Sequence, residues 1–246
     1  MIQPLHYQLV ADATTEFLAL ARQYHFCEDH LDDIERRLYE ESPFKGPGVV
    51  IDKKEENRMK VFINPGHDRK YDSGAVNPNS GLREADVAAN VGELVKGYLE
   101  AAGCDCKLMQ SDNLAPTGAG RSEYDDRQGL TVTETANEWG ADVFVSIHCN
   151  AFNESAHGTE VECYGGGEGQ KLAQYIQNQI IDALGTLDRG VKAMPKLLVL
   201  KYTDMTAVLV EMAFIDNDDD AELLANHQDD FARAIARGVT DYEQSL

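Results

Sequence analysis

From residue 59 onward, short runs rich in β-branched and aromatic residues alternate with longer amphipathic segments of helical period. This alternation is typical of an α/β fold, because parallel strands are joined by crossover helices. The expected strands are residues 60–64, 105–109, 142–148, 159–164 and 207–211, with a weaker one near 197–200. The expected helices are residues 84–102, 131–139, 168–184 and 229–242. We therefore predict a twisted, mostly parallel sheet with helices on both faces.

The first part of the chain has a different pattern. Residues 11–41 show apolar side chains at helical spacing, which favours one or two helices. The segment 42–48, Ser-Pro-Phe-Lys-Gly-Pro-Gly, then ends the pattern, because proline and glycine are poorly tolerated inside a helix. A chain of 246 residues can form one full-sized domain and a small addition. We predict a small N-terminal helical extension over 1–48 and one larger domain over 49–246.

Charge limits the classes of partner. The chain carries 22 Lys and Arg against 43 Asp and Glu, a formal net charge of −21. Phosphate contacts need clustered cations, so we expect no binding to nucleic acid. The same charge disfavours anionic membranes and anionic wall polymers unless a local basic patch supplies the attraction.

Features of export and membrane insertion are also not expected. The N-terminus, Met-Ile-Gln-Pro-Leu-His, lacks the basic and apolar regions of a secretory signal, and we find no apolar stretch long enough to span a bilayer. Five cysteines, an odd number, are then most simply reduced thiols. We expect synthesis in the cytoplasm without a signal peptide.

Four segments each place one metal-binding or acid-base side chain beside an apolar run. These side chains are His67, Glu84, His148 and Glu211. The two histidines follow or close expected strands, and ligands of open α/β sheets bind at the carboxyl ends of the strands. Two histidines and a carboxylate are the minimum donor set for a catalytic zinc that keeps a position open for water. A second carboxylate can deprotonate that water.

The residues around the two glutamates predict a different role for each. Glu84 lies three and seven residues before Val87 and Val91, on the apolar stripe of its expected helix. A carboxylate on that side is costly unless a cation balances it, which favours a zinc ligand. Glu211 follows Val208-Leu209-Val210, and such apolar surroundings should raise its pKa into the range of a general base.

Each residue also has an ordinary structural explanation. The histidines could be hydrogen-bonded residues at strand ends, and Glu84 could be a first-turn carboxylate favoured by the helix dipole. Glu211 could pair with a buried Lys or Arg. The metal site is favoured because four separate elements each offer one suitable donor at one edge of one sheet.

These segments resemble those of the zinc-dependent N-acetylmuramoyl-L-alanine amidases of the Amidase_3 family, which includes phage endolysins. The resemblance covers residue 61 to the C-terminus and depends on the order and spacing of its motifs. The matching segments are Gly66-His67, Gly81-Leu82-Arg83-Glu84, Ser146-Ile147-His148-Cys149-Asn150 and Val210-Glu211-Met212-Ala213-Phe214-Ile215-Asp216-Asn217. The resemblance implies that His67, Glu84 and His148 hold zinc and that Glu211 is catalytic.

The resemblance also implies a reaction and a substrate. The expected enzyme hydrolyses the amide between N-acetylmuramic acid and L-alanine of the stem peptide, in peptidoglycan or in a soluble muropeptide. Asn150 is the candidate for contact with the substrate. Without an export signal, such an enzyme would reach the wall by lysis or through a dedicated pore, as phage endolysins do, or act on recycled fragments. The sequence predicts no oligomeric state.

Two alternatives remain open at this point. The same donor set could serve another zinc-dependent wall peptidase or an amino-sugar deacetylase, because a fold does not choose its substrate. The chain could also be a non-catalytic wall-binding or regulatory module. The presence of all four chemical positions favours an enzyme.

Overall fold

The computed structural model of the chain describes residues 58–121 and 129–246. The predicted extension over 1–48 and its boundary lie outside the described residues. Within the described ranges, no helix combines the length and the apolar character that crossing a bilayer requires.

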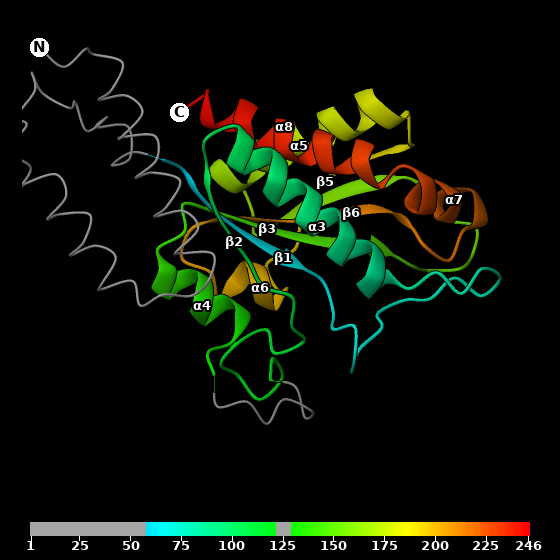
Figure 1. Ribbon diagram of the computed structural model, residues 1–246, viewed down its shortest axis with the longest axis horizontal. Coiled ribbons are helices and arrows are strands. Elements are labelled where there is room, and N and C mark those ends of the chain that lie inside the picture. Colours follow the sequence, from blue (N-terminus) through cyan, green and yellow to red (C-terminus); the bar gives the residue numbers. More distant parts are fainter. Residues whose placement is uncertain (1–57, 122–128) are drawn as a thin grey trace, which may run out of the picture. The chain divides into compact units, whose positions relative to one another are not determined.

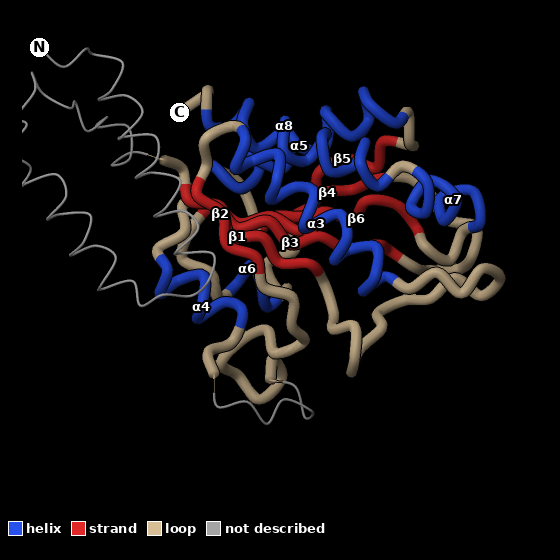
Figure 2. Tube along the Cα trace, viewed as in Figure 1, coloured by secondary structure: helices blue, strands red, loops and turns tan. Residues whose placement is uncertain are grey.

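A single sheet organises the described residues. It contains six strands in the order β2-β1-β3-β6-β4-β5, shown in red in Figure 2. Neighbouring strands are parallel except for β4 and β6, which are antiparallel. The strands are β1 (Lys60–Pro65), β2 (Asp105–Leu108), β3 (Val143–Asn150), β4 (Thr159–Cys163), β5 (Asp188–Ala193) and β6 (Thr206–Phe214). The predicted α/β class and mostly parallel sheet are confirmed.

Helices cover the two faces of the sheet unequally (Figure 1). The long helices α3 (Glu84–Ala101), α5 (Glu168–Leu184) and α8 (Gln228–Glu243) lie on one face, and the short helices α4 (Val132–Trp139) and α6 (Leu198–Lys201) lie on the other. Helix α7 (Asp218–Asn226) follows β6. Successive strand residues point to opposite faces, so Val61 and Ile63 join the first core while Phe62 joins the second.

The short helices cover only the first half of their face. Side chains of α4 and α6 pack against Phe62, Phe144 and Leu209. Two residues further along the same strands, the same face carries Asn64, Ser146 and Glu211. The carboxyl half of this face is therefore polar.

Three elements differ from the sequence-based predictions. The strand expected near 197–200 is wrong: Leu198–Lys201 forms the short helix α6. A run of four apolar residues carries no period that separates a strand from a buried helical turn. Strand β5 was not expected, because it is a partly exposed edge strand with few β-forming residues and a glycine at φ 77°.

The third difference is helix α7, which lies in an acidic segment that resembles a loop in the sequence. The Asn217 side chain accepts a hydrogen bond from the Asp220 backbone N–H and so caps the first turn. Three aspartates in that turn interact favourably with the helix dipole. Capping and dipole together explain a helix in so polar a segment.

Candidate metal centre

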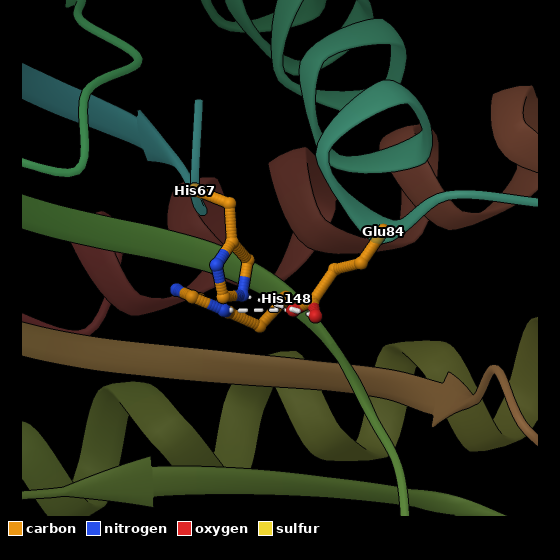
Figure 3. Close-up of side chains that lie close together, drawn as sticks. All are labelled: His67, Glu84 and His148. Carbon is orange, nitrogen blue, oxygen red and sulfur yellow. Dashed lines mark hydrogen bonds and ion pairs between the residues drawn. The ribbon is translucent and has the colours of Figure 1, made fainter. Parts of the chain in front are cut away.

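His67, Glu84 and His148 come from three elements and meet at the carboxyl end of the sheet. His67 follows β1, Glu84 begins α3, and His148 lies in β3. One donor atom of each lies within 4.8 Å of the others. Figure 3 shows both imidazoles pointing toward the carboxylate, with His67 Nε2 3.0 Å from Oε2 and His148 Nδ1 2.9 Å from Oε1. The three side chains can therefore share one small cation.

The Glu84 carboxylate is buried but fully hydrogen-bonded. Besides the imidazoles, the backbone N–H of Ala75 donates to Oε2 at 2.9 Å and that of Cys149 donates to Oε1 at 3.0 Å. Burial pushes the pKa of Glu84 upward, yet its hydrogen bonds with His148 and His67 hold that pKa well below its usual range. The prediction that Glu84 faces the interior is confirmed, and its charge is balanced there.

Asp72 fixes the orientation of the His67 ring. His67 adopts φ 64°, which turns the chain sharply after β1. Its Nδ1 lies 2.8 Å from Asp72 Oδ2, which leaves Nε2 directed toward Glu84. Burial lowers the pKa of His67, but Glu84 and Asp72 outweigh burial and raise it to about 9. A second hydrogen bond of this kind is usual for metal-binding histidines. Sequence reasoning did not identify this role of Asp72.

Two glycines make room for the imidazoles. A Cβ added to Gly66 would lie 2.3 Å from the His148 ring. At Gly74, where φ is 63°, it would lie 2.5 Å from the His67 ring and 2.6 Å from Glu84 Oε2. The backbone approaches the three donors more closely than any larger residue would allow.

Glu211 lies beside the three donors, in the middle of a row across the sheet. It pairs with His148 of β3 on one side and with Glu160 of β4 on the other. Its Oε2 is buried and accepts no hydrogen bond from any described residue, and no described Lys or Arg forms an ion pair with it. Burial, and then the negative charge of Glu84, raise its pKa well above the usual range. The sequence predicted that Glu211 ends its strand. In the structure β6 continues to Phe214, so Glu211 lies within the strand.

Asn150 lies further along β3 and contacts Glu160, the outer member of this row. Its Nδ2 donates to Glu160 Oε1 at 3.0 Å. Glu160 Oε2 accepts from Arg189 Nε at 2.6 Å and also from Lys192 Nζ. Burial opposes ionisation, but Lys192 and Arg189 lower the pKa of Glu160. Sequence reasoning gave no role to Glu160, Arg189 or Lys192, although the two glutamates that alternate with Val161 in β4 are a usable signal.

The donor set fits zinc. Two imidazole nitrogens and one carboxylate oxygen are a common protein ligand set for a catalytic zinc ion, and they leave a fourth position open. Glu211, paired with His148 across β3 and β6, adds a buried Oε2 that has no hydrogen-bond partner among the described residues. The arrangement can hold a divalent cation with a proton acceptor next to it.

Comparison with known proteins gives the family. The Amidase_3 family, described as N-acetylmuramoyl-L-alanine amidase, matches residues 61–241. The chain is 36% identical to the amidase LytC of Bacillus subtilis, over 74% of this chain and 35% of that protein. It is 34% identical to the endolysin of Bacillus phage SPP1, over 72% of this chain and 62% of that protein.

A solved structure agrees with these matches. The amidase AmiC2 of Nostoc punctiforme superposes with a TM-score of 0.65 and 32% identity, covering 76% of this chain and 98% of that one. The family match, residues 61–241, covers all four chemical positions and the whole sheet except Lys60. The chain therefore belongs to the Amidase_3 family of N-acetylmuramoyl-L-alanine amidases.

Proposed function

We propose that the chain is a zinc-dependent amidase that hydrolyses the bond between N-acetylmuramic acid and L-alanine of the peptidoglycan stem peptide. The observation that carries this proposal is the meeting of His67, Glu84 and His148 within 4.8 Å, in a chain of this family. The neighbouring acceptor on Glu211 supports it.

The placement of the side chains supports the following roles. His67, Glu84 and His148 hold the metal, and Asp72 keeps the His67 ring in position. When bound, zinc lowers the pKa of water and stabilises negative charge on the carbonyl oxygen of the substrate. Glu211 accepts the proton from the attacking water and later delivers it to the leaving amine of L-alanine.

Digestion of purified peptidoglycan tests this function. The protein is incubated with and without a chelator, and the released fragments are identified by mass. We expect intact stem peptides with a free L-alanine amine, loss of release with chelator, and recovery when zinc is added. Undiminished release with chelator would refute zinc dependence, and fragments cut within the peptide or deacetylated sugars would indicate the alternative reactions.

We also propose that residues 49–246 form the catalytic domain and residues 1–48 a separate extension. The family match, which starts at residue 61, supports this division. Limited proteolysis of the full chain should cut within 42–48 and leave a resistant fragment that starts near residue 49. Cleavage first within 60–246 would argue against the division.

The relation to the SPP1 endolysin supports action on the cell wall after release from the cell. Activity on whole sacculi and on soluble muropeptides, measured side by side, would separate this route from action on recycled fragments.

A further inference from the structure

Arg189 and Lys192 lie on the edge strand β5 and both reach back to the row that contains Glu211. Both bind Oε2 of Glu160, whose side chain is 6% exposed, while their own side chains are 30% and 37% exposed. Both cationic side chains therefore bind a buried acid and remain partly accessible to solvent.

Both cations can form further hydrogen bonds and ion pairs besides those with Glu160. They share one oxygen of a single carboxylate, and its other oxygen is taken by Asn150. The Arg189 guanidinium lies 4.7 Å from the Phe214 ring centre, and Nη1 donates to the His157 carbonyl at 3.4 Å. Within the described part of the chain, Arg189 Nη2 donates to no atom. A planar guanidinium fixed in this way is suited to a carboxylate.

The nearest further acid does not cancel this charge. Glu162 lies opposite Lys192 in the register of β4 and β5 and is buried. Burial, and then the charge of Glu160, raise the pKa of Glu162, which favours its neutral form. The pair thus gives a chain of net charge −21 a local cationic group beside its candidate catalytic row.

Strand spacing limits which substrate group could reach the pair. Adjacent strands are about 4.8 Å apart, so Glu160 lies about 10 Å from His148 and about 5 Å from Glu211 across the sheet. In an extended stem peptide, the second residue places a free carboxylate about 6 Å from the scissile nitrogen, since one residue spans about 3.5 Å and two further bonds add the rest. This is the first free carboxylate after the bond that is cut.

We infer that Arg189 and Lys192 form an anion subsite that binds the free α-carboxylate of the second stem-peptide residue, D-isoglutamate. The subsite rests on the proposed amidase function and adds a determinant of substrate choice. A peptide in which this carboxylate is amidated loses the charge-assisted hydrogen bonds. The enzyme should therefore prefer isoglutamate to isoglutamine at this position.

Two matched substrates test the subsite. N-acetylmuramoyl tripeptides that differ only in D-isoglutamate or D-isoglutamine are compared with the unmodified protein, Arg189→Gln and Lys192→Gln. We expect the unmodified protein to show a KM about tenfold lower for the acid. Each variant should raise KM for the acid about tenfold, with KM for the amide and both kcat values little changed.

The control is Arg233→Gln, which removes one cation from the solvent-exposed side of α8. It should leave both KM values unchanged, and Lys192→Arg should retain the preference for the acid. Thermal unfolding of each variant identifies loss of folding. The subsite would be refuted if the unmodified protein had equal KM values for the two substrates, or if the variants changed both KM values equally. Arg189 and Lys192 would then serve only to neutralise Glu160.

A binding measurement separates this inference from the proposed reaction. Calorimetry with L-alanyl-D-isoglutamate and its isoglutamine counterpart should show tighter binding of the acid to the unmodified protein and not to Lys192→Gln. If this preference is found but neither muramoyl substrate is cleaved, the proposed reaction fails and the subsite stands. If cleavage occurs without any preference in binding or KM, the subsite fails alone.

Discussion

The two faces of the sheet are built from the same strands, yet one is a core and the other holds the candidate site. In β3, Ile147 and Cys149 point into the core beneath α3, α5 and α8, while His148 between them points to the opposite face. The difference lies in coverage: three long helices pack on the first face, and the short helices α4 and α6 pack on only half of the second. Where the short helices end, the face carries buried and half-buried polar side chains, and the candidate site lies among them.

The polar half of the second face also lowers the stability of the folded state. Glu160 and Glu211 pair in this half, Glu162 follows beside Leu209, and burial raises the pKa of Glu162 and Glu211. A group of buried acids lowers the free energy of unfolding, and such groups are found where function requires them. Substitutions in the polar half of the second face should therefore lower activity, whereas substitutions beneath the covering helices should lower stability.

The largest effect is expected for Glu211→Gln in the polar half of the second face. Removing the proton acceptor should lower kcat by a factor of about 10²–10⁴, while zinc stays bound because the three ligands are unchanged. Turnover of a muropeptide and zinc content per chain are the measurements. Near-normal turnover in this variant would show that Glu211 is not the base.

On the first face, Phe231→Ala should lower the free energy of unfolding by about 3–5 kcal/mol. Phe231 lies on α8 and is fully buried in the larger core, so truncation leaves a cavity. Urea unfolding measures the loss, and kcat per folded molecule should stay unchanged. A loss of kcat without a loss of stability would break the distinction between the faces.

A smaller effect is expected for Asp72→Asn, which weakens the orientation of His67. Zinc affinity should fall about 10–100-fold, as measured by competition with a chelator, and the unfolding free energy should stay nearly constant. Asp105→Asn, an exposed aspartate at the start of β2, is the matched control for charge. Equal zinc affinity in both variants would exclude a positioning role for Asp72.

The smallest effect is expected for Thr131→Ala, at the start of the short helix α4 on the second face. Thr131 and Glu134 form a capping box there. Its loss should cost about 1 kcal/mol of stability, measured by chemical denaturation, and should leave zinc affinity and turnover unchanged. A marked fall in turnover would show that α4 shapes the site and does more than cover its half of the face.

The sequence determined the fold class and the residues that meet at the candidate metal centre. Helical and strand periods are local, so most elements could be placed from the pattern alone, and helix α5 was predicted with its observed bounds. The local pattern did not predict the three elements whose conformation depends on burial or capping, which are α6, the edge strand β5 and the acidic helix α7.

Only the tertiary structure decided how the donors are oriented and what surrounds them. The hydrogen bond from His67 to Asp72, the close approach at Gly66 and the row of His148, Glu211 and Glu160 join residues through strand pairing and a sharp turn. The anchoring of Arg189 and Lys192 by Glu160 spans 29 and 32 residues of chain. Contacts of this range leave no periodic trace in a sequence, because register between strands is set by packing of the whole sheet.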